Sequence, residues 1–145
     1  MGCVSKRLVL DTSIVVAALR SREGASNLLL RQIANRRLLL LLSPPLFLEY
    51  EEVLKRPEQQ IVHRLREEEV DRFLAELAAI AMPVDIYFRW RPLGADPSDE
   101  MVLETAINGQ ADALITFNVS DFAPAEKFDI RVLTPAQFLR RWRHE

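Results

Sequence analysis

The chain has 145 residues, enough for one domain with a single substantial core. Apolar residues make up 49% and charged residues 28%, which excludes a disordered protein, and no apolar stretch reaches the roughly 18 residues needed to span a bilayer. The net charge of −2 gives no overall basic field for nucleic acid, and the single cysteine excludes an internal disulfide and a cysteine-based metal site. We therefore expect one domain over residues 1–145 in a cytoplasmic protein that does not enter a membrane.

Short apolar runs alternate along the chain with amphipathic segments. In chain order, we expect a strand at 7–10, helices at 14–19 and 25–34, a strand at 38–42, helices at 44–55, 58–66 and 67–81, a strand at 84–88, a helix at 97–108, a strand at 112–116, a short helix at 118–122, a strand at 130–133 and a helix at 135–142. Strands that alternate with helices predict a mostly parallel sheet covered on both faces. Right-handed crossovers then favour an α/β fold of three layers, α/β/α, with five strands in the order 3-2-1-4-5.

Four acidic residues stand out because the predicted topology brings them to one edge of this sheet. Asp11 directly follows the first strand and Asp121 closely follows the fourth. Glu49 lies in the second turn, and Asp99 in the first turn, of helices that begin with proline. The carboxyl edge of an open α/β sheet is where ligands bind. Clustered carboxylates repel one another unless a cation lies between them, and oxygen ligands without histidine or cysteine suit Mg²⁺ or Mn²⁺. Such a cation can activate water and stabilise the leaving oxygen of a phosphodiester.

Each acid also has a purely structural interpretation. Side chains at helix N-termini act as caps, and this role fits Asp11, Asp99 with Asp96, and Asp121 with Asn118. The helix at 44–55 leaves a different ambiguity, because Glu49 and Glu51 flank its apolar stripe about equally. The two histidines, His63 and His144, lie outside these segments, and we expect both at the surface.

Four segments of the chain, in order and spacing, resemble the PIN-domain nucleases and within them the toxins of VapC-type toxin–antitoxin pairs. These segments are Leu-Val-Leu-Asp-Thr-Ser-Ile-Val-Val-Ala-Ala-Leu at 8–19, Leu-Ser-Pro-Pro-Leu-Phe-Leu-Glu-Tyr-Glu-Glu-Val-Leu-Lys-Arg-Pro at 42–57, Asp-Pro-Ser-Asp-Glu-Met-Val-Leu-Glu-Thr-Ala at 96–106 and Ala-Asp-Ala-Leu-Ile-Thr-Phe-Asn-Val-Ser-Asp-Phe at 111–122. The resemblance implies a PIN-like fold and a Mg²⁺- or Mn²⁺-dependent endoribonuclease. It further implies an RNA substrate and a cognate antitoxin as partner.

The resemblance also assigns roles to individual residues. It places the catalytic and metal-binding acids of the family on Asp11, Glu49, Asp99 and Asp121, and supporting polar positions on Ser13, Thr116 and Asn118. Many relatives carry aspartate where this chain has Asn118, which leaves the fourth ligand open between Asn118 and Asp121. The alternative function is a non-catalytic PIN-like module that binds nucleic acid or protein.

Members of this family often form homodimers. Apolar residues near the C-terminus are our candidates for such a contact: Phe138, Leu139 and Trp142.

Overall fold

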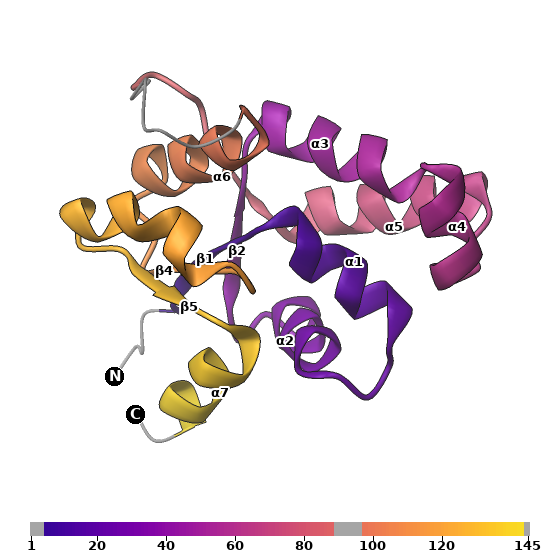
Figure 1. Ribbon diagram of the computed structural model, residues 1–145, viewed down its shortest axis with the longest axis horizontal. Helices are drawn as coiled ribbons and strands as arrows, with labels where there is room; N and C mark the ends of the chain where they lie inside the picture. The colour runs from indigo at the N-terminus through magenta and orange to yellow at the C-terminus, as the bar shows by residue number, and fades with distance from the viewer. Residues whose placement is uncertain (1–4, 89–96, 144–145) are drawn as a thin grey trace.

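The computed structural model describes residues 5–88 and 97–143 (Figure 1). The strands are β1 (Arg7–Leu10), β2 (Leu39–Leu42), β3 (Met82–Pro83), β4 (Ala113–Ile115) and β5 (Arg131–Leu133). The helices are α1 (Thr12–Arg20), α2 (Ala25–Ala34), α3 (Pro44–Leu54), α4 (Pro57–His63), α5 (Glu67–Ile80), α6 (Pro97–Asn108), the 3₁₀ segment η1 (Val119–Phe128) and α7 (Pro135–Arg143). None of the helices in the described part of the chain has the length and apolar character that crossing a membrane requires.

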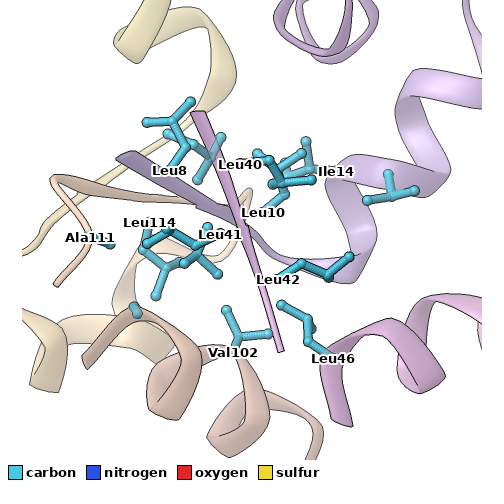
Figure 2. Close-up of a cluster of buried hydrophobic side chains, with 14 of the residues drawn as sticks. Leu8, Leu10, Ile14, Leu40, Leu41, Leu42, Leu46, Val102, Ala111 and Leu114 are labelled. Atoms are coloured by element: carbon cyan, nitrogen blue, oxygen red, sulfur yellow. The ribbon is translucent and has the colours of Figure 1, made fainter. Parts of the chain in front are cut away.

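The sheet has the predicted architecture. Its five strands lie in the order β3-β2-β1-β4-β5, and every neighbouring pair is parallel. Helices cover both faces: α2 and α7 lie on one side of the strands, and α3 and α6 lie on the other (Figures 1 and 2). The α/β/α fold and the 3-2-1-4-5 order are thus confirmed.

The central strands are apolar because both of their faces are covered. Leu8 of β1 pairs with Leu40 of β2, and both side chains are fully buried. Figure 2 shows these two leucines on one side of the sheet, whereas Leu114 lies on the side of α6, which contributes Val102. A strand buried on both faces carries continuous apolar sequence rather than alternation, so the leucine-rich run before Ser43 forms β2 in spite of the helical preference of leucine.

The third strand lies earlier than predicted. We expected a strand at residues 84–88, but the pairing partners of β2 are Met82 and Pro83. The last hydrogen bond of this pairing runs from the Val84 N–H to the Leu42 carbonyl at 2.9 Å. Leu42 is the last residue of β2, so the strand offers no further partner. Pro83 fits an edge strand, where a missing N–H is tolerated. The chain then leaves the sheet, and the N–H groups of Tyr87 and Phe88 donate to the Asn108 side chain instead.

The segment after β4 is a 3₁₀ segment that is longer than the predicted helix at residues 118–122. Phe122 interrupts it with non-helical angles of φ −112° and ψ 17°, and Pro124 lies within it. The Phe122 side chain is fully buried, so core packing holds the break in place. The segment ends at Asp129, which has a positive φ of 61°.

His63 is a second correction, because it is buried rather than at the surface. Its ring Nε2 donates to the Leu54 carbonyl at 2.9 Å, and its Nδ1 accepts from the Leu65 N–H at 3.0 Å. Arg64 turns the chain with a φ of 61°, which places the ring against the end of α3. His63 therefore links α3 to α4 through both of its ring nitrogens. The other histidine, His144, and the predicted cap Asp96 lie outside the described residues.

The C-terminal helix uses its apolar residues within the chain. Phe138 and Leu139 are each 6% exposed and belong to the core, and the Phe138 ring stacks on Trp142 with centroids 6.4 Å apart. The chain itself thus buries most of Phe138 and Leu139, and Trp142 packs partly buried against the core. A homodimer with contacts at these three residues stays a prediction.

Candidate active site

Asp11 lies where the two central strands β1 and β4 end. Its N–H donates to the Ile115 carbonyl at 2.9 Å, which continues the pairing of these strands by one step. Its carboxylate is buried, and the same oxygen, Oδ2, accepts from the hydroxyls of Thr116 at 2.8 Å and Ser13 at 3.1 Å. Both hydroxyl residues that the resemblance selected as supporting positions thus contact Asp11 directly.

The structural interpretation of Asp11 as a capping side chain does not hold. Asp11 occupies the N-cap position of α1, but its side chain makes no capping hydrogen bond. Its backbone carbonyl instead accepts from the Ile14 N–H at 2.9 Å. The carboxylate is oriented by the two hydroxyls rather than by the amides of α1.

The structure distinguishes Glu49 from Glu51. The helix α3 begins as predicted, with Ser43 Oγ accepting from the Leu46 N–H at 3.3 Å and proline in its first turn. Glu49 is 7% exposed and lines the same pocket as Asp11. Glu51 is turned toward Lys55, with which it forms an ion pair at 3.2 Å. Only Glu49 of the two lies at the carboxyl edge of the sheet.

Tyr50 links α3 to the end of β1. Its hydroxyl donates to the Leu10 carbonyl at 2.5 Å, one residue before Asp11, and the side chain is fully buried. Burial, followed by the negative charge of Asp11, raises the pKa of the Tyr50 hydroxyl well above 10.0. Tyr50 therefore remains a neutral donor at physiological pH. The sequence did not predict this hydrogen bond, because a pattern of apolar residues cannot show where a buried hydroxyl points.

The helix α6 brings Ser98 and Asp99 near α3. The Ser98 hydroxyl donates to Glu49 Oε1 at 3.5 Å, a long contact, and Asp99 follows as a half-buried residue in the first turn. A buried pair of hydroxyls, Ser43 Oγ and Thr105 Oγ1 at 2.7 Å, fixes the two helices against each other. Ser98 was not among the predicted site residues. Its position directly before Asp99, in the first turn of the predicted helix, could have indicated that it lies near the site.

Asn118 and Asp121 lie farther out. Both are exposed, and neither lines the pocket that Asp11 and Glu49 share. Asn118 donates its backbone N–H to Thr116 Oγ1 at 3.0 Å, and its side chain makes no capping bond to η1. The structure thus brings Asp11 and Glu49 together at one pocket but leaves these two residues outside it.

The shared pocket has a volume of about 400 Å³. Besides Asp11 and Glu49, its lining includes Ser13, Ser98, Arg20, Arg56 and Phe117. Sequence reasoning did not select Arg20 or Phe117. Arg20 directly follows the motif segment at 8–19 and Phe117 lies within the segment at 111–122, but periodicity gives no reason to prefer either residue. The pocket therefore combines acids, hydroxyls, cations and one aromatic ring.

The donor set of the pocket fits a hard divalent cation. Its potential ligands are carboxylate and hydroxyl oxygens, the type that Mg²⁺ and Mn²⁺ prefer. Glu49 is buried, yet among residues 5–88 and 97–143 its only polar contact is the neutral Ser98 hydroxyl, and burying a carboxylate without a cation is costly. The same residues contain no group of three or more histidine, cysteine, aspartate or glutamate side chains arranged to hold a metal ion. The four-acid ligand set thus stays a prediction.

The sequence matches the family described as PIN domain over residues 7–120. That range includes Asp11, Glu49 and Asp99 as well as Asn118, and it ends one residue before Asp121. No curated protein matches the chain.

Proposed function

Because this chain belongs to the PIN domain family, whose members are in general nucleases, we propose that it is a metal-dependent endoribonuclease that hydrolyses RNA phosphodiesters. The observation that carries the proposal is the pair of buried carboxylates, Asp11 and Glu49, that two separate elements bring to one pocket at the carboxyl edge of the sheet. This edge is the usual ligand site of open α/β sheets. The coarser assignment, a nuclease and therefore a hydrolase, follows from the family itself.

The residues of the pocket would have different roles in the reaction. Asp11 and Glu49 would hold Mg²⁺ or Mn²⁺, with Asp99 as a third ligand from the neighbouring helix α6. When bound, such a cation supplies an activated water and stabilises the leaving oxygen. The hydroxyls of Ser13 and Thr116 fix the orientation of Asp11, as outer hydrogen-bond partners of metal ligands do. A fourth ligand would come from Asn118 or Asp121.

The cations of the pocket would bind the RNA backbone. Arg20 and Arg56 both line it, and both are exposed. Arginine presents a planar fork of donors that matches two phosphate oxygens. Although the net charge of the chain is −2, these two guanidinium groups place positive charge next to the acids, where a phosphodiester would lie.

The proposal extends to a toxin role. The resemblance of the motif segments to VapC-type toxins supports an RNase that a cognate antitoxin restrains in the cytoplasm. Controlled expression of the chain in a bacterial host should arrest growth, and co-expression of a neighbouring small reading frame should relieve the arrest. Growth unaffected by a well-expressed active chain would contradict the toxin role and leave the nuclease proposal standing.

The test of the nuclease proposal uses Glu49 and Glu51 as a matched pair. We expect Mg²⁺- or Mn²⁺-dependent RNA cleavage that EDTA abolishes. Glu49→Gln should lower the rate of cleavage by at least about 100-fold, which is the upper end of the effect of changes to residues that only support metal ligands. Glu51→Gln should cleave RNA at the rate of the native chain. Cleavage that survives both EDTA and Glu49→Gln would overturn the metal mechanism.

A non-catalytic binding module is the second candidate. The observation in its favour is that the described residues contain no group of three potential metal-binding side chains. Calorimetric titration with Mn²⁺ separates the two functions. A site of millimolar affinity or better that Asp11→Ala removes supports the enzyme, and the absence of binding at that concentration supports the module.

A further inference from the structure

Phe117 is an exposed aromatic side chain at the rim of the pocket. We propose that it stacks on an unpaired base next to the scissile phosphate and thereby distinguishes unpaired from paired sites in RNA. The inference rests on the proposed nuclease function and adds a specificity-determining residue.

Phe117 contrasts with the residues before it in the chain. The strand β4 and Thr116 are buried, with exposed fractions of 0–3%, whereas Phe117 is 50% exposed. Core packing therefore does not account for a large apolar residue at this position. Its place in the lining of the pocket that Asp11 and Glu49 share distinguishes it from the other exposed apolar side chains, such as Ile61 and Tyr87, and gives it access to a ligand bound there.

The backbone around Phe117 is fixed on both sides. Thr116 donates its N–H to the Leu133 carbonyl at 3.0 Å and its hydroxyl to Asp11 at 2.8 Å. The same hydroxyl accepts from the Asn118 N–H at 3.0 Å. These three hydrogen bonds constrain the main chain before and after the ring. A ring on such a support loses little conformational freedom when a ligand binds, which favours affinity.

The neighbours of Phe117 match the parts of a nucleotide. The ring lines the same pocket as Asp11 and Glu49, where the phosphodiester would be hydrolysed. Arg20, which makes no ion pair among the described residues, is the first candidate for the adjacent phosphate; Arg56 also lines the pocket but pairs with Glu52 at 3.1 Å. Aromatic rings combined with a positively charged groove are how proteins bind single strands without reading sequence.

The geometry of nucleic acids then selects the substrate. In a duplex, neighbouring bases cover both faces of each base, so a protein ring finds no free face. An unpaired base offers that face, and proteins recognise single-stranded RNA by stacking such bases on aromatic side chains. Phe117 is thus expected to discriminate between unpaired and paired sites rather than between base types.

Tyr87 provides a matched control. It is the most exposed of the large apolar side chains in the described residues, at 88%, and it does not line the pocket. Its backbone N–H donates to the Asn108 side chain at the C-terminal end of α6, whereas Ser98 at the opposite end of that helix lines the pocket. Removal of the Tyr87 ring tests whether any exposed aromatic side chain of this protein binds RNA.

The experiment measures RNA binding separately from cleavage. Short single-stranded RNA that carries 2-aminopurine is titrated into the full chain with Glu49→Gln, in which we expect hydrolysis to be suppressed. Stacking on Phe117 should quench the fluorescence. In the chain that carries Glu49→Gln, Phe117→Ala should remove the quenching and raise the Kd by roughly 5- to 150-fold, which corresponds to the loss of one base–aromatic stack. Phe117→Trp, which keeps an aromatic ring, should instead preserve binding. Phe117→Leu, which keeps an apolar side chain without a ring, should behave like Phe117→Ala.

The outcomes separate this inference from the nuclease proposal. Loss of binding in Phe117→Ala but not in Tyr87→Ala, with duplex RNA unaffected by either, supports the stacking role even when the native chain cleaves nothing. Equal affinity of Phe117→Ala and its parent for single-stranded RNA overturns the stacking role even when metal-dependent cleavage is present. Rescue by Phe117→Leu overturns it as well, because a leucine cannot stack.

Discussion

Replacement of Tyr50 by phenylalanine removes one hydroxyl from the most buried part of the site. The hydroxyl donates to the Leu10 carbonyl at 2.5 Å, and the ring is fully enclosed, so the substitution changes neither the shape of the core nor any exposed surface. Loss of the donor deprives a buried carbonyl of a hydrogen bond. The expected decrease in the free energy of unfolding is about 1–3 kcal/mol at neutral pH.

This difference should depend on pH in one direction. Burial and the charge of Asp11 raise the pKa of Tyr50 above the 10.0 of an unperturbed tyrosine. The unfolded chain therefore releases this proton at a lower pH than the folded chain does. The stabilisation is fully present below about pH 10, and it decreases by about 1.4 kcal/mol per pH unit as the pH rises from there toward the pKa of the folded state.

Urea unfolding of the wild type and Tyr50→Phe, followed in parallel from pH 7 to above pH 10, measures both effects. Subtraction of the two free energies of unfolding cancels the contribution of every other titrating group. We expect a constant gap at neutral pH that narrows and then reverses at alkaline pH. Equal stability at neutral pH would refute the hydrogen bond, and a gap that stays constant above pH 10 would refute the raised pKa.

Two further substitutions test the surroundings of the site. Thr116→Val removes the hydroxyl that donates to Asp11. We expect the free energy of unfolding in urea to fall by about 1–3 kcal/mol and the rate of RNA cleavage to fall by about 10–100-fold. An unchanged rate would show that Asp11 does not need this hydrogen bond. Lys55 contacts Asp71 at 2.6 Å, Glu51 at 3.2 Å and Glu67 at 3.7 Å, and its pKa is raised, mainly by the hydrogen bond to Asp71. Lys55→Met should therefore lower the urea midpoint at neutral pH. The decrease should be smaller in about 1 M NaCl, because salt screens these ion pairs. It should also become smaller as the pH rises above 10.5, because deprotonation of Lys55 removes the pairs.

The sequence predicted the fold well because the fold depends on features that are local and repeated. Continuous apolar runs specify buried parallel strands, and residues such as Ser43 and Pro44 specify where helices begin. Alternation of the two then restricts the topology, since crossovers are right-handed. The edge strand β3 was misplaced because two residues carry little pattern of their own, and its position depends on where β2 ends.

The site was less predictable because it depends on directions that periodicity does not resolve. Glu49 and Glu51 flank the same stripe, and only the packing of α3 against β1 and α6 decides which one is buried. In the sequence, Phe117 looks like a further apolar residue at the end of a buried strand. The pattern does not predict that its side chain is half exposed at the pocket. Asp121 is exposed and does not line the pocket of Asp11, so its place among the ligands stays a prediction.

The hydrogen bonds of the pocket also bear on the proposed metal site. Hydroxyls contact both buried carboxylates: those of Ser13 and Thr116 orient Asp11, and that of Ser98 contacts Glu49. A neutral donor fixes the direction of a carboxylate but does not neutralise its charge, so these contacts leave each negative charge in place. In the proposed function, a divalent cation would supply the positive charge that these neutral donors lack, next to an Asp11 carboxylate whose direction the two hydroxyls already fix.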